Sequence, residues 1–250
     1  MIVHLTIAVR GRKALARTES ERRAVVRMLA RLAGDSLLLF NVVDDHLHLV
    51  VRARQPGRLG RSVGLGLGGL RPELRLKRAH PELVDSRSYL RFLVRYVYQQ
   101  SGEKGLGPDA TWSGSSFQDL VGARRLPGLD RLAIFEELPR LRMREVFPLV
   151  GLKPRPLEPR EAAASDGIER LTRASAAACC VAPELPGRSA PVLRAVSVAL
   201  ALALEAGLSS AEVRRGLRRS RSALSRLRRH RPDPRDLIAA RLRLALEDRS

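Results

Sequence analysis

Cysteine is scarce in this 250-residue chain, and aromatic residues make up only 4% of it. The two cysteines, Cys179 and Cys180, are adjacent, and neighbouring cysteines rarely form a structural bridge. We therefore expect no disulfide framework, and a reducing cytoplasm is the natural compartment. The start, Met1-Ile2-Val3-His4, is not typical of a signal peptide. The longest mostly apolar run, 196–204, is shorter than the ~20 residues that a membrane span needs, so no membrane partner is expected.

Acidic residues are also few relative to basic ones. The chain has 26 Asp and Glu against 46 Lys and Arg, which gives a formal net charge of +20. The positive charges on such a surface repel one another. Binding to a polyanion is favourable, because Lys and Arg release the counterions of the phosphates that they contact. A genome with arginine-rich codon usage is the alternative explanation. We expect a nucleoid-associated protein with DNA as its partner, as a monomer or a homodimer.

The first half of the sequence predicts a mixed fold. Alternating patterns and turn residues predict strands at 2–9, 37–43 and 46–51, a loop at 57–70 and a short strand at 74–79. Two helices are expected: one capped by Thr18 or Ser20 and closed by Gly34, and one at 89–100 closed by Gly102. This order is that of a ferredoxin-like α+β domain.

The second half predicts a different organisation. Prolines from Pro127 to Pro159 indicate a linker over 126–162 with short helices. It would join a first domain, 1–125, to an all-helical domain, 163–250. Helices are expected in the latter at 168–180, 191–206, 210–217, 221–230 and 237–246.

Two histidines on a predicted strand are the first candidate site. Strand side chains alternate between faces, so His46 and His48 point the same way and Leu47 points into the core. Two neutral imidazoles on one face can bind a divalent metal. Two surface histidines on a hairpin are the plainer alternative.

The predicted helix over 89–100 favours the metal site. Tyr96 and Gln100 are four residues apart and share a helix face, so Gln100 can supply an amide oxygen as third ligand and Tyr96 a phenol oxygen beside the ion. A free phenol, with a pKa of about 10, is a poor nucleophile near neutral pH, and a nearby cation favours its ionised form.

Tyr98 lies about 200° further around the helix and is expected to be a packing residue. His4 and His80 are substitute ligands or ordinary surface or core histidines. Asp44 and Asp45 make a tight turn or, as the alternative, orient the metal ligands by hydrogen bonds.

These segments together resemble a known family. The strand Asp44-Asp45-His46-Leu47-His48-Leu49-Val50-Val51 resembles the His-hydrophobic-His strand of HUH endonucleases, and 89–100 resembles their tyrosine helix. The stretch Trp112-Ser113-Gly114-Ser115-Ser116-Phe117 is similar to the one that follows this helix in REP-associated tyrosine transposases. The resemblance covers roughly 1–125.

The resemblance implies a function. It implies an HUH domain that acts on a single-stranded DNA hairpin, with Mg²⁺ or Mn²⁺ at His46, His48 and Gln100. It also implies that Tyr96 forms a 5′-phosphotyrosine and leaves a free 3′-hydroxyl during transposition. Two alternatives stay open: a non-catalytic, sequence-specific DNA-binding regulator derived from a transposase, and a replication initiator or plasmid relaxase.

Two further patterns bear on binding. The stretch Gly64-Leu65-Gly66-Leu67-Gly68-Gly69 fits G-x-G-x-x-G. Because no clear helix opens at its third glycine and no acidic residue ends a following strand at the expected distance, we expect a flexible loop near DNA. From Ser209 to Arg231 there are nine Arg and one Glu, in a pattern that predicts a helix-turn-helix with a basic second helix. The region from Ile168 on, with Leu185-Pro186-Gly187-Arg188-Ser189 before a long helix, resembles the C-terminal DNA-binding domain of the replication initiator DnaA. The candidate DNA-binding residues are Arg214, Arg215, Arg218, Arg219, Arg221, Ser222, Ser225, Arg226 and Arg229.

Overall fold

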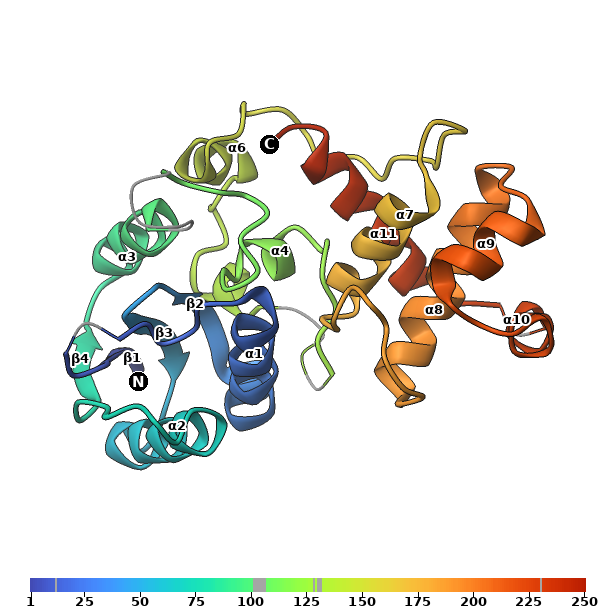
Figure 1. The fold of residues 1–250 in the computed structure, drawn as a ribbon. Coiled ribbons are helices and arrows are strands. Elements are labelled where there is room, and N and C mark those ends of the chain that lie inside the picture. The colour runs from blue at the N-terminus through green and yellow to red at the C-terminus, as the bar shows by residue number, and fades with distance from the viewer. Residues whose placement is uncertain (12, 101–106, 128, 130–131, 230) are drawn as a thin grey trace. The chain divides into compact units, whose positions relative to one another are not determined.

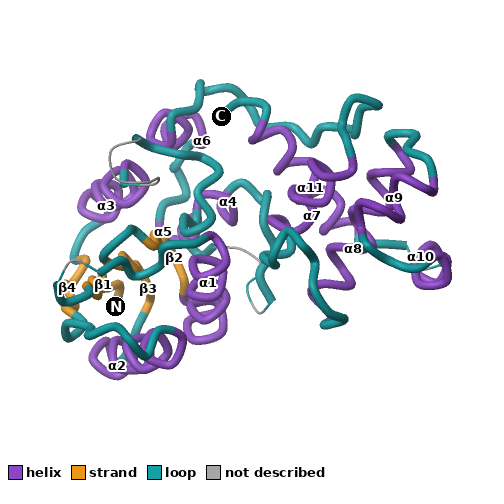
Figure 2. The backbone as a smooth tube through the Cα atoms, in the orientation of Figure 1, coloured by secondary structure: helices purple, strands orange, loops and turns teal. Residues whose placement is uncertain are grey.

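The computed structural model describes the chain except residues 12, 101–106, 128, 130–131 and 230. The described residues form two compact units, 1–120 with 126–156, and 121–125 with 157–249. Figure 2 shows the second unit as helices joined by loops, and in the described residues every strand belongs to the first unit. Within this part of the chain no helix is both long enough and apolar enough to cross a bilayer.

The first unit is built on a four-stranded antiparallel sheet (Figure 1). Its strands are β1 (Ile2–Ala8), β2 (Leu37–Val42), β3 (His46–Arg52) and β4 (His80–Val84), in the spatial order β2-β3-β1-β4. Its helical segments are α1 (Glu19–Ala33), η1 (Gly34–Ser36), α2 (Pro56–Leu70), α3 (Arg87–Gln99), α4 (Phe117–Leu120), α5 (Ile134–Glu137), α6 (Met143–Val146) and η2 (Phe147–Val150). The sheet thus confirms the prediction of a mixed α+β fold.

Local sequence explains where α1 and α3 begin. Thr18 and Glu21 form a reciprocal capping box at the start of α1, so the unpaired amides of its first turn are satisfied. Ser86 caps α3 by accepting a hydrogen bond from the Tyr89 amide. Gly34 ends α1 as predicted, whereas Gly102, expected to end α3, lies outside the described residues.

The loop predicted over 57–70 is wrong, because these residues form α2. Pro56 starts this helix, and Val63 and Leu67 are buried on one face. The glycines let α2 approach its neighbours closely: a Cβ on Gly60 would lie 2.7 Å from the Cβ of Ala79, and one on Gly66 would lie 2.8 Å from the Met28 sulfur of α1. Packing against α1 and the sheet therefore outweighs the low helix propensity of glycine.

The fourth strand lies later than predicted. Of the expected 74–79 strand, Leu76 forms an isolated bridge to Val9, just beyond β1, and the Lys77 amide donates to the Ala8 carbonyl, whereas β4 begins at His80. β4 is an edge strand that pairs only with β1, and its first four residues are exposed. An edge strand tolerates Pro81 and polar side chains, which is why alternation did not reveal it.

Residues 126–156, part of the predicted linker, belong to the first unit. The Ala133 amide donates to the Leu37 carbonyl at 2.9 Å, and Arg52 of β3 pairs with Glu136 and Glu137. Short helices do occur there, but they pack onto the sheet domain.

The second unit contains α7 (Ile168–Ala178), α8 (Ala190–Glu205), α9 (Ser210–Leu217), α10 (Arg221–Arg228) and α11 (Pro234–Glu247). All five helices lie close to their predicted positions; His230, the predicted end of α10, lies outside the described residues. Their apolar faces share one core that includes Cys179, and Cys180 is buried as well; the two cysteines form no disulfide.

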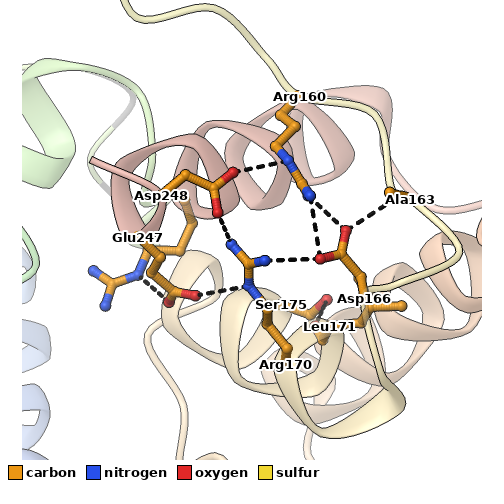
Figure 3. Close-up of polar contacts among 9 residues, drawn as sticks. Arg160, Ala163, Asp166, Arg170, Leu171, Ser175, Glu247 and Asp248 are labelled. Atoms are coloured by element: carbon orange, nitrogen blue, oxygen red, sulfur yellow. Dashed lines mark hydrogen bonds and ion pairs between the residues drawn. The ribbon is translucent and has the colours of Figure 1, made fainter. Parts of the chain in front are cut away.

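An ionic cluster joins the start and end of this unit (Figure 3). The Asp166 carboxylate is buried and accepts from Arg160 and Arg170 at 2.5 and 2.8 Å, and Asp248 pairs with the same two arginines. Burial alone would raise the pKa of Asp166, but hydrogen bonds from Arg160 and the Ala163 amide and the charges of the two arginines lower it below its ordinary 3.8. The cluster thus holds α7 against the end of α11.

Candidate functional site

The register of the sheet gathers several polar side chains on one face. His46 and His48 of β3 pair with Ala8 and Thr6 of β1, and His4 lies two residues before Thr6. Because paired residues share a face, His4, His46 and His48 all lie on the same side of the sheet. α3 covers that side, and Asn41 of β2 donates to the Val97 carbonyl of α3 at 3.0 Å.

Three donor atoms converge at the end of α3. The Nε2 atoms of His46 and His48 are 2.8 Å apart, and Oε1 of Gln100 lies 3.3 Å from the first and 3.1 Å from the second. Gln100 is the C-cap of α3, so its side chain leaves the helix where the histidine strand passes. The structure therefore brings together the two histidines and the glutamine that the sequence singled out.

Tyr96 lies one helical turn before Gln100 and faces the histidines. Its ring centroid is 5.2 Å from that of His48, edge-on, and 6.4 Å from that of His4. The Gln100 amide donates to the Tyr96 carbonyl at 3.4 Å. Tyr96 is 40% exposed, so its phenol is open to a ligand from solvent.

Tyr98 has a different environment. Its side chain is 0% exposed, its hydroxyl lies 3.2 Å from Oγ of Ser116, and its ring packs edge-on against Phe117. Tyr98 is therefore a packing residue, as its helical position predicts. The Trp112–Phe117 stretch also supports β2, since the Trp112 indole donates to the Val42 carbonyl at 2.9 Å.

Each histidine of the pair contacts a further group through its second ring nitrogen. Nδ1 of His46 lies 2.6 Å from the Asp45 carboxylate. Nδ1 of His48 lies 3.0 Å from Nε2 of buried His4, whose own Nδ1 is 3.8 Å from the Glu82 carboxylate. If each ring donates its Nδ1 proton along these contacts, both Nε2 lone pairs face Gln100. His4 and Glu82 could not be placed here from sequence, because their positions depend on strand register.

Burial keeps the central histidine neutral. Burial, followed by repulsion from His46 and His4, lowers the pKa of His48 to about 3, although the hydrogen bond with Gln100 acts in the opposite direction. Burial also lowers the pKa of His4, although Glu82 opposes this shift. His48 is therefore uncharged near pH 7, which is the state in which imidazole binds metals.

The donor set fits a divalent cation. In the described residues no group of three His, Cys, Asp or Glu side chains could hold a metal, so the set depends on the Gln100 amide oxygen. Neighbouring ligands of an octahedral ion at ~2.1 Å are about 3 Å apart, which is close to the observed separations. Two unprotonated Nε2 atoms 2.8 Å apart also repel unless a proton or a cation lies between them. Three protein donors would leave coordination positions open for water or substrate.

A second candidate site lies on α9 and α10. The three-residue turn 218–220 joins these helices, and Arg218 ends α9 in a left-handed conformation. Among the described residues, an open hollow of about 410 Å³ lies between the helices and is lined by Arg214, Arg221 and Arg228. Of the predicted DNA-binding residues, these are exposed: Arg214, Arg215, Arg218, Arg221, Ser222, Ser225, Arg226 and Arg229.

Two arginines differ from their predicted roles. Arg219 is half-buried and donates to the carbonyls of Leu185 and Gly187 at 2.7 and 2.8 Å, so it anchors the turn after α7. Arg228 was not among the candidates, yet it lines the hollow and donates to Ser210. Its spacing of seven residues from Arg221, two helical turns, could have revealed the shared face.

Comparisons of the chain with protein-family models, with curated proteins and with solved structures found no match.

Proposed function

We propose that this protein is a metal-dependent endonuclease and strand transferase that cuts single-stranded DNA at hairpin or palindromic sites, with Tyr96 as nucleophile. One observation carries the proposal: His46, His48 and Gln100 converge on one point, and the Tyr96 ring lies beside them. The chain has three tyrosines, and Tyr96 is the one that contacts the histidines while remaining exposed.

The proposed reaction is a transesterification. The Tyr96 phenol oxygen attacks the scissile phosphorus, a tyrosine–phosphate bond forms, and the bond from phosphorus to the 3′-oxygen breaks. The phenol proton is lost and the departing oxygen gains one, so the products are a 5′-phosphotyrosine and a free 3′-hydroxyl. Mg²⁺ or Mn²⁺ at His46, His48 and Gln100 would offset charge that develops on the phosphate. The covalent link conserves the phosphodiester for later rejoining.

Two features of the fold support this assignment. The element order β1-α1-β2-β3-α2-β4 and the spatial order β2-β3-β1-β4 agree with a ferredoxin-like domain, the fold that the resemblance to HUH transposases implies. α9, the turn and α10 suit a helix-turn-helix that would anchor the enzyme on duplex DNA, because arginines line their exposed sides.

Adduct formation on a labelled hairpin tests the proposal. Incubation of the full chain with Mn²⁺ and a hairpin with unpaired flanks, taken from the genomic neighbourhood of the gene, should give a protein–DNA adduct that survives denaturing electrophoresis. Tyr96→Phe should abolish this adduct. Tyr98→Phe is the matched control. It also removes one phenol oxygen, but from a buried ring two residues further along the helix, so it should leave the adduct intact.

The regulator hypothesis predicts the opposite pattern. A non-catalytic DNA-binding protein would bind duplex DNA equally well after His46→Ala and Tyr96→Phe and would form no adduct with any divalent metal. That result would reject the nuclease proposal. An adduct that persists in Tyr96→Phe would reject Tyr96 as the nucleophile.

A further inference from the structure

Three aromatic side chains form a row along one face of α3, with Tyr89 half-buried and Phe92 and Tyr96 exposed. The ring centroids of Tyr89 and Phe92 are 6.1 Å apart, and those of Phe92 and Tyr96 are 5.9 Å apart. Neighbouring rings are nearly parallel, with angles of 17° and 16° between their planes. We call these three residues the aromatic row. It ends at Tyr96, whose ring contacts His48.

The aromatic row is not needed to build the core. Phe92 is 56% exposed, although aromatic residues are rare in this chain. The buried face of α3 consists of other side chains: Leu90, Leu93, Val94, Val97 and Tyr98. Contiguous exposed apolar groups next to a polar site commonly mark a binding surface.

The charges around the aromatic row favour an anionic partner. At 100° per residue, Arg95 projects about 60° around α3 from Phe92. Arg87 and Arg95 are both exposed, and neither forms an ion pair within the described residues. Acidic groups lie at the far end, where burial, followed by a hydrogen bond to Glu82, raises the pKa of Tyr89 to about 12. Arg87 lies at the Tyr89 end, whereas Arg95 is next to Tyr96, so the end at Tyr96 is basic through Arg95 and aromatic.

We propose that the aromatic row is a stacking platform for unpaired bases of the DNA strand that Tyr96 cuts, with Phe92 as its central contact. The ligand is single-stranded DNA, because a duplex conceals its base faces, whereas every unpaired base offers one. Arg95 would contact the backbone beside the stacked base. This inference rests on the proposed function and adds the contact that would hold the strand next to the nucleophile.

Binding measured without catalysis tests the platform. The full chain is titrated in EDTA with a fluorescent hairpin that carries unpaired flanks, and with the same hairpin whose flanks are abasic. Phe92→Ala should weaken binding of the first hairpin by roughly 5- to 150-fold, the range for loss of one stacked base. It should leave binding of the abasic hairpin unchanged. Leu65→Ala is the matched control, because Leu65 is an exposed apolar residue of α2 and should have no effect.

Phe92→Trp supplies an independent readout. The single tryptophan, Trp112, is 4% exposed and lies under the Arg22 guanidinium, so an added indole on α3 would report the platform. This variant should bind at least as tightly as the parent, and its added fluorescence should be quenched by the hairpin with bases but not by the abasic one.

The outcomes separate this inference from the nuclease proposal. Equal affinity of Phe92→Ala and the parent for the first hairpin, or an equal loss on the abasic hairpin, would overturn the stacking platform even if Tyr96 forms an adduct. A loss confined to the hairpin with bases would support it even if no adduct forms with any metal. Thermal unfolding of Phe92→Ala within a few degrees of the parent would show that the variant is folded.

Discussion

Replacement of His4 by leucine should weaken metal binding although His4 is not a proposed ligand. His4 Nε2 is 3.0 Å from Nδ1 of His48, and both side chains are buried. Leucine has similar bulk but accepts no hydrogen bond. His48 would then lose the contact that keeps its proton on Nδ1, and the tautomer with a proton on Nε2 cannot bind an ion through that nitrogen, the one that faces Gln100.

The size of the loss in metal affinity can be estimated from the contact between His4 and His48. Loss of a group that orients a histidine ligand typically costs 10- to 100-fold in metal affinity. The buried Nδ1–H without an acceptor would also cost the fold about 1–3 kcal/mol. His4→Gln should retain part of the metal affinity, because an amide oxygen can accept from His48 while the amide nitrogen donates towards Glu82.

Calorimetric titration of the full chain with Mn²⁺ measures this affinity. Urea unfolding without metal measures the loss in free energy of unfolding. His80→Leu is the comparison variant, because His80 lies on the same face of the sheet, paired with Thr6, but is exposed and acts on His4 only through its charge, so it should change the affinity much less than His4→Leu. A His4→Leu variant that is folded and binds Mn²⁺ within twofold of the parent would refute the argument that His4 positions His48.

Three further predictions concern stability and DNA binding. Gly60→Ala should destabilise the fold by about 1–3 kcal/mol in urea unfolding, because its Cβ would meet Ala79, whereas Gly64→Ala has no atom within 4 Å and should stabilise it by about 0.5–1 kcal/mol. Asp166→Asn should cost about 3 kcal/mol at pH 7. Because the native pKa of Asp166 is lowered, its contribution is present above pH ~4 and is lost as the pH falls through the native value, so the parent and the variant should converge in acid unfolding curves. Arg221→Gln should lower duplex affinity and reduce the slope of log Kd against log salt by about 1 in anisotropy titrations.

Sequence periodicity predicted the elements with strong local signals. The start of α1 at the predicted cap Thr18, strands β2 and β3 with the turn between them, and the helices of the second unit were all placed within a few residues. α2 and β4 were missed for physical reasons. Gly60 and Gly66 allow close packing of α2, which only tertiary contacts reveal, and β4 is an exposed edge strand with a proline. In both segments tertiary context outweighs local propensity.

The candidate site divides in the same way. His46 with His48, and Tyr96 with Gln100, are related by the repeat of a single strand or helix, so sequence alone could pair them. Their meeting depends on the packing of α3 onto the sheet. His4 and Glu82 enter through the pairing of β1 with β3 and β4, which no local pattern encodes. The groups that would carry chemistry could thus be identified from the sequence, as could Asp45 beside His46, whereas Glu82 and the orienting role of His4 could not.

The geometry also bears on whether one chain can hold the whole site. His46 and His48 come from β3, and Gln100 and Tyr96 from the end of α3, all within the first unit. Asn41 fixes the last turn of α3 to β2 through the Val97 carbonyl, next to Tyr96. No element of a second copy is therefore needed to bring the tyrosine to the histidines. If the proposed chemistry occurs, mixing a Tyr96→Phe chain with a His46→Ala chain should not restore adduct formation, because each chain lacks one part of its own site.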